Sequence, residues 1–158
     1  MNKRDLLARI IAQLAAELEQ ITNAALATHA EATDEENKAE DKYDTRGLEA
    51  SYLAHGQSKA AEEAAQAVAQ FQALPVRDFA PGEPISLGAL VRLEGRGASH
   101  YFIGPRAGGT EIEAGGKPVL VITPQSPLGR QLMGRKQGDT LQLDLGGKRS
   151  EFRVSSVA

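Results

Sequence analysis

The stretch Thr33–Glu49, TDEENKAEDKYDTRGLE, decides how this chain folds. It holds seven carboxylates against three cations, and an alanine-rich helical pattern approaches it from each side. Thr33 and Glu36 match the T-x-x-E pattern of a helix capping box. The stretch is also long beside the roughly 2–8 residues that usually join bundled helices. We therefore predict that residues 33–49 form the acidic tip of a helical hairpin. An ordinary solvated connection between two helices is the alternative.

Apolar and small residues on both sides of the tip repeat with alternating spacings of four and three, as the seam of a coiled coil does. The two series are Leu7, Ile11, Leu14, Leu18, Ile21, Ala25, Thr28 and Ala32, and then Ala50, Ala54, Gln57, Ala61, Ala64, Val68 and Phe71. When the second series is reversed onto the first, the layers match and the chain turns back near Asp41. Pro75 ends the second helix, because the residue before a proline is disfavoured in helical conformation. Residues 1–75 are thus predicted to form an antiparallel coiled-coil hairpin.

The pattern changes after residue 75 to a period of two, punctuated by Gly and Pro. The segments that alternate as strands do are Ala89–Leu93, Tyr101–Ile103, Val119–Ile122, Thr140–Leu145 and Glu151–Val154. One short helix is expected between them, with Ser126 as N-cap, Pro127 in its first position and Gly134 at its end. Residues 76–158 are therefore predicted to form a small, mainly antiparallel sheet domain with one short helix, and the fold class is α+β.

Composition excludes several classes of function. Cysteine is absent, which excludes disulfides and thiol chemistry. No apolar run approaches the ~18 residues of a membrane span. The net charge of −3 divides into 13 acids and 7 bases in residues 1–75, and 8 acids and 11 bases in residues 76–158. This distribution contains no dense Lys/Arg stripe of the kind that binds nucleic acid directly. We expect a cytoplasmic protein that does not contact membranes.

Neither half contains a recognisable catalytic or metal-binding constellation. His29 and His55 fall at similar heights on the two predicted helices, but no third ligand accompanies them. His100 has no serine or acidic partner at a recognisable spacing. We therefore expect that the chain is not itself an enzyme and that the free protein binds no metal.

The segment Val121–Asp139, VITPQSPLGRQLMGRKQGD, resembles the SPI(A/G)RALLGKKxGD segment of the GreA/GreB family of bacterial transcript-cleavage factors. The order of parts, an acidic-tipped helical hairpin followed by a small sheet domain, is also similar. The resemblance implies that residues 76–158 have an FKBP-like fold and dock on RNA polymerase at the rim of its secondary channel. The residues that it implies as polymerase contacts are Gln125, Ser126, Pro127 and Arg130. Nucleic acid would then be contacted only indirectly, through the transcription complex.

The same resemblance implies that the tip passes down the channel towards the catalytic Mg²⁺ of the polymerase, a hard cation that prefers oxygen ligands. The tip acids expected to assist this magnesium are Glu40, Asp41, Asp44 and Glu49. Cleaving members carry a tip similar to GDLSENAEY, whose acid positions fall on Thr45 and Leu48 here. The expected function is a Gre-like elongation factor that modulates elongation or stimulates the polymerase's own cleavage of backtracked RNA. A non-cleaving channel regulator and a polymerase-independent coiled-coil adaptor are the alternatives.

Overall fold

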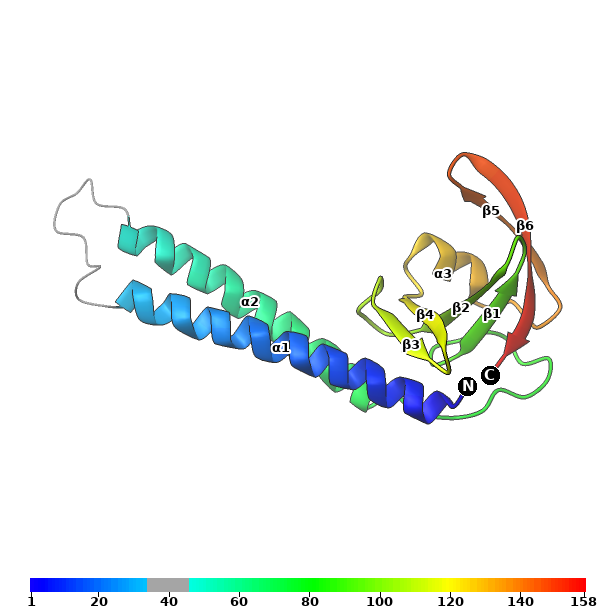
Figure 1. The fold of residues 1–158 in the computed structure, drawn as a ribbon, viewed down its shortest axis with the longest axis horizontal. Helices are drawn as coiled ribbons and strands as arrows, with labels where there is room; N and C mark the ends of the chain where they lie inside the picture. The colour runs from blue at the N-terminus through cyan, green and yellow to red at the C-terminus, as the bar shows by residue number, and fades with distance from the viewer. Residues whose placement is uncertain (34–45) are drawn as a thin grey trace. The chain divides into compact units, whose positions relative to one another are not determined.

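A computed structural model describes residues 1–33 and 46–158, with side chains described for residues 1–31, 55–144 and 146–158. Contacts within this part of the chain define two units, which are residues 11–69, and residues 1–10 together with 70–158. The elements are α1 (Lys3–Thr33), α2 (Arg46–Gln72), β1 (Leu90–Glu94), β2 (Ala98–Ile103), β3 (Glu111–Ala114), β4 (Lys117–Ile122), α3 (Pro127–Leu132), β5 (Thr140–Leu145) and β6 (Lys148–Val157) (Figure 1). The first unit is a pair of helices and the second is built around a sheet.

Residues 11–69 form an antiparallel pair made from α1 and α2 (Figure 1). The described seam residues are buried or half-buried, while most residues between them are exposed. These seam residues are Ile11, Leu14, Leu18, Ile21, Ala25, Thr28, Gln57, Ala61, Ala64 and Val68. The burial confirms the predicted helical hairpin over the described residues, because only one face of each helix is removed from water. The predicted reversal near Asp41 lies outside the described residues.

The sheet has the strand order β3-β4-β2-β1-β6-β5. All neighbouring strands are antiparallel except β2 and β4, which are parallel. All five predicted strands and the short helix are present, so the α+β fold class is confirmed. Strand β3 and the parallel pair were not predicted. β3 has only four residues. The sequence marks Gly115-Gly116 as hairpin glycines, and they form the turn between β3 and β4 with positive φ, but strand direction depends on the path of the whole connection between β2 and β4.

The sheet buries both of its faces. On the face next to α3, strand residues, the segment before β1 and the buried Leu132 of α3 form one apolar cluster, which includes Phe79, Ile85, Leu93, Ile103, Leu132 and Phe152. Phe102 and Val121 alternate with residues of that cluster, so they point to the opposite face. There the end of α2 supplies Phe71, whose ring lies 6.4 Å from the ring of Phe102.

Both helix ends therefore belong with the sheet. Leu6 and Ile10 of α1 and Phe71 of α2 are all fully buried, and Nη1 of Arg9 donates to the carbonyl oxygen of Glu113 at 3.4 Å. The division into units accordingly differs from the single boundary expected at residue 75. The physical reason is that Leu6, Ile10 and Phe71, at these helix ends, are buried in the core of the sheet unit.

Candidate functional site

The short helix α3 carries the residues implied as contacts, and its start is held by a local hydrogen-bond network. Ser126 is extended (φ −65°, ψ 155°) and its Oγ accepts from the backbone N–H of Gly129. The donor–acceptor distance is 3.0 Å, and the same hydroxyl donates to the carbonyl oxygen of Thr123 at 2.8 Å. Pro127 follows in the first helical turn. The predicted N-cap is therefore confirmed, and the Ser126 hydroxyl is occupied within the chain.

The other three implied contact residues are accessible. Gln125, Pro127 and Arg130 are exposed, whereas Ser126 is half-buried. They come together because the cap turns the chain sharply between the end of β4 and α3. This arrangement gives Ser126 a positioning role and leaves the other three side chains available to a partner. Contact with a polymerase stays a prediction.

A cavity of about 310 Å³ lies beside this exposed group. Its lining residues are Tyr101, Pro127, Leu128, Gln131, Leu143 and Asp144, which come from β2, α3 and β5. We call this the α3 cavity. Only Pro127 among them was predicted as a site residue. Tyr101, Leu128 and Leu143 were missed because an apolar residue in a strand or short helix has the same sequence pattern whether it lines a cavity or fills the core.

The α3 cavity can be compared with the pocket of a prolyl isomerase, the enzyme activity that an FKBP-like domain could have. Prolyl isomerisation in an FKBP-like domain would call for an apolar pocket lined by aromatic rings. Tyr101 is the single aromatic among the described residues that line the cavity. Phe102 lies on the opposite face against Phe71, and Phe79 and Phe152 belong to the core cluster.

The acids and histidines considered as metal ligands are only partly described. Glu40, Asp41 and Asp44 lie outside the described residues, and Glu49 is described only as part of the backbone of α2. Among the side chains that the structure does describe, no three His, Asp or Glu residues gather as a metal site would require. Within the same part of the chain, no helix combines the length and apolar character needed to cross a membrane.

The chain is similar in sequence to known proteins. The family model described as "Transcription elongation factor, GreA/GreB, C-term" matches residues 84–158, which include all six strands and α3. The transcription inhibitor protein Gfh1 of Thermus thermophilus is 31% identical over 131 residues, covering 76% of this chain and 75% of that protein. Gfh1 of Thermus aquaticus is 30% identical over 124 residues, covering 76% and 74%.

A crystal structure of Gfh1 from Thermus thermophilus is similar over 94% of both chains, at 21% identity and a TM-score of 0.39. The sequence relatives match about three quarters of this chain, and the family model includes Val121–Asp139, the segment that resembles the family. This chain belongs to the GreA/GreB family of transcription elongation factors.

Proposed function

We propose that this protein regulates transcription by binding RNA polymerase, with its sheet domain docked at the rim of the secondary channel. Its hairpin would carry the acidic stretch Thr33–Glu49 towards the catalytic Mg²⁺. The observation that carries the proposal is the antiparallel pair of helices joined by that stretch (Figure 1). From Ile11 to Thr33, α1 spans about 35 Å at about 1.5 Å per residue. Two packed helices form a narrow rod, since each helix is about 10–12 Å across with its side chains.

The charge of the stretch fits this role. Seven carboxylates stand within residues 33–49, and clustered acids repel one another, which destabilises an idle connection. Near a magnesium ion the same carboxylates are favourable, because Mg²⁺ takes one or two carboxylates together with waters and substrate phosphate. We infer that Glu40, Asp41, Asp44 and Glu49 act on the polymerase's magnesium, while the free protein holds none.

The composition of the tip favours regulation without cleavage. The acid positions of cleaving family members fall on Thr45 and Leu48 in this chain, and leucine has no oxygen with which to bind a cation. Arg46 adds a positive charge beside them. The two Gfh1 relatives described above are both transcription inhibitors by name. We therefore propose that the protein slows the polymerase and does not stimulate hydrolysis of backtracked RNA.

The docking surface proposed on the sheet domain is the α3 cavity with Gln125 and Arg130 beside it. Its apolar walls, Leu128 and Leu143, suit an apolar side chain of the partner. Arg130 is exposed and provides a charged contact at the edge. This combination of a central apolar contact and a polar rim is typical of protein interfaces.

The decisive experiment adds the protein and Mg²⁺ to backtracked elongation complexes and measures both RNA length and the rate of extension. We expect unchanged RNA length and slower extension. The variant Asp41→Ala/Asp44→Ala should bind polymerase with the parent's affinity and lose the inhibition. The matched control is Glu62→Ala/Glu63→Ala, which removes two exposed acids from α2 and should inhibit as the parent does. Shortened RNA would show that the protein stimulates cleavage. Full inhibition by Asp41→Ala/Asp44→Ala would show that these tip acids are not needed for inhibition.

A binding experiment tests the docking surface separately. Arg130→Ala should weaken binding to core RNA polymerase by about tenfold, the loss expected for one charge-assisted hydrogen bond. Arg106→Ala, which removes another exposed arginine of the same unit, serves as control and should change nothing. Equal affinities for all three proteins would remove Arg130 from the interface. Failure of the parent to bind polymerase would overturn the proposal in favour of a polymerase-independent coiled-coil adaptor.

A further inference from the structure

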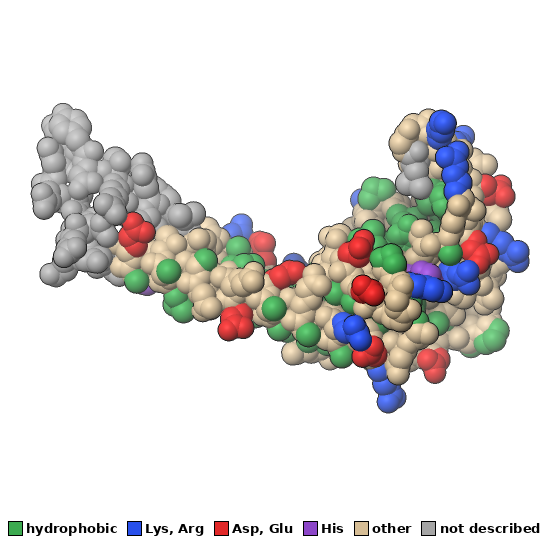
Figure 2. Space-filling model, in the orientation of Figure 1, with side chains coloured by type: hydrophobic (Ala, Val, Ile, Leu, Met, Phe, Trp, Pro, Cys, Tyr) green, Lys and Arg blue, Asp and Glu red, His purple; other side chains and the backbone are tan. Residues whose placement is uncertain are grey.

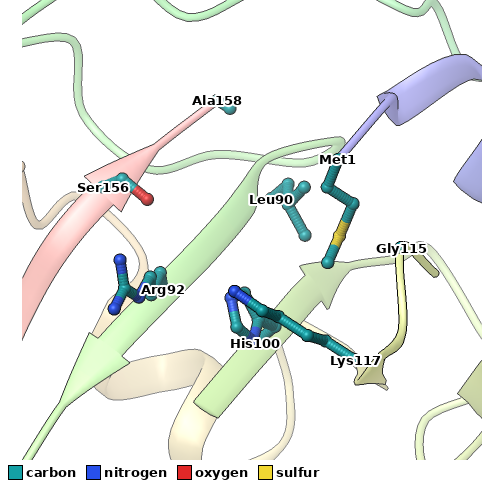
Figure 3. Close-up of a pocket in the computed structure, with 8 residues that line it drawn as sticks. All are labelled: Met1, Leu90, Arg92, His100, Gly115, Lys117, Ser156 and Ala158. Atoms are coloured by element: carbon teal, nitrogen blue, oxygen red, sulfur yellow. The ribbon is translucent and has the colours of Figure 1, made fainter. Parts of the chain in front are cut away.

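A second cavity, of about 260 Å³, opens on the sheet face opposite α3 (Figure 3). It is lined by Met1, Leu90, Arg92, His100, Gly115, Lys117, Ser156 and Ala158, all within the sheet unit. We call it the cationic cavity. It is separate from the α3 cavity. Val91 and Tyr101 face the core cluster next to α3, so their neighbours Arg92 and His100 point to the opposite face of the sheet.

Strand register brings three basic side chains together in this cavity. Arg92 of β1 lies directly opposite His100 of β2, and His100 in turn lies opposite Val119 of β4. Lys117 is two residues before Val119, so its side chain points to the same face. Figure 3 shows His100 and Lys117 side by side with Arg92 on the neighbouring strand. Figure 2 shows Lys and Arg side chains gathered on one face of the sheet domain, with Asp and Glu side chains among them.

The electrostatic environment favours an anion. Partial burial lowers the pKa of His100 from its ordinary value, and the positive charges of Lys117, Arg92 and the amino terminus lower it further. The charged groups that shift the pKa of His100 are all positive. An anion placed among the three side chains would reverse this effect, because an opposite charge favours the protonated imidazole.

Arg92 provides a second, independent observation. Its Nη2 pairs with Oε1 of Glu94 at 2.7 Å, yet its Nε is buried and has no hydrogen-bond partner among the described residues. Buried donors are nearly always paired in native proteins. Lys117 forms no ion pair within the described part of the chain either. The cavity therefore contains one buried donor, Nε of Arg92, without an acceptor among the described residues, and a lysine without an ionic partner there.

We propose that the cationic cavity binds the phosphate group of a nucleotide. Arg92, Lys117 and protonated His100 supply charged donors, and Ser156 supplies a hydroxyl. Phosphate oxygens match such donors through short, charge-assisted hydrogen bonds. The cavity extends beyond these groups to the apolar side chains of Met1 and Leu90 (Figure 3), which suit the organic part of the ligand.

Calorimetric titration of the full chain with ATP, inorganic phosphate and adenosine, at matched ionic strength, tests this proposal. ATP should bind saturably and more tightly than phosphate, and adenosine should bind weakest. Lys117→Gln should weaken ATP binding by about tenfold, the loss of one charge-assisted hydrogen bond. Lys148→Gln, which replaces an exposed lysine of the same unit, should leave it unchanged. Absence of saturable ATP binding, or equal weakening by both substitutions, would overturn the site.

A magnetic resonance titration of the His100 imidazole gives a second readout that needs no substitution. Its pKa should rise when ATP or phosphate is bound, because the phosphate charge favours imidazolium. An unchanged His100 pKa at saturating ATP would place the ligand elsewhere and overturn the assignment. Adenosine binding as tightly as ATP would exclude phosphate as the recognised group, and phosphate binding as tightly as ATP would exclude a role for Met1 and Leu90.

Discussion

The contact between the end of α2 and the sheet makes a quantitative prediction about a pair of substitutions. Phe71 is fully buried and stacks on Phe102 with ring centroids 6.4 Å apart. Phe71→Ala removes this ring and leaves a cavity, so the free energy of unfolding should fall by about 3–5 kcal/mol. Gly104 lies against the same ring. A Cβ added there would stand 2.7 Å from Cζ of Phe71 and 2.8 Å from Cγ1 of Val121.

Gly104→Ala therefore overpacks a filled site and should cost about 1–3 kcal/mol. In the double variant the ring is gone, and the added methyl group enters the space it occupied. The double variant should then lose less stability than the sum of the two single losses, by about 1 kcal/mol or more, since residues in direct contact are coupled. The close contact between the added methyl group and Val121 persists in the double variant, so only part of the overpacking is relieved.

Urea unfolding followed by circular dichroism measures all three variants. Gly97→Ala is the matched control, because a Cβ at Gly97 would meet no described atom within 4 Å, and the stability change should stay within about 0.5 kcal/mol. The denaturant slope should be the same for all proteins, so that midpoints report stability. Losses that add to within about 0.5 kcal/mol would refute the proposed packing of Phe71 against Gly104.

Three further predictions follow from single residues. Ser126→Ala removes the cap of α3 and should lower the free energy of unfolding by about 1 kcal/mol in the same urea assay; an unchanged midpoint would contradict the cap. Leu14→Ala should lower the free energy of unfolding by about 2–5 kcal/mol, because Leu14 is only 5% exposed. Leu26→Ala is the control and should change the midpoint little, because Leu26 is 63% exposed. Similar losses of stability in both variants would contradict the predicted seam. The pKa of His100 is lowered from 6.5 in the folded protein, so the unfolded chain binds that proton more readily, and stability should fall as pH drops below about 6.5. Urea unfolding measured across pH should show this loss of stability below about pH 6.5 in the parent, and the part due to His100 should be absent from His100→Gln.

The predictions from sequence succeeded where a structure depends on neighbours in the chain. The alternation of Leu14, Leu18 and Ile21 set the buried face of α1, because the helix repeats every 3.6 residues. Ser126 and Pro127 set the start of α3 through hydrogen bonds that span three residues. The site on the sheet domain was found only in part, since Pro127 was predicted and Tyr101 and Leu143 were not.

Sequence alone thus determined the paired helices, the acidic stretch between them, the strand segments and the capped helix, because periodicity and capping act within a few residues. Tertiary structure decided the rest. The parallel pairing of β2 with β4 and the burial of Phe71 on the sheet join residues far apart in the chain. Tertiary structure also brings Arg92, His100 and Lys117 together, because strand register places them side by side and no local pattern within one strand specifies which strands lie next to it.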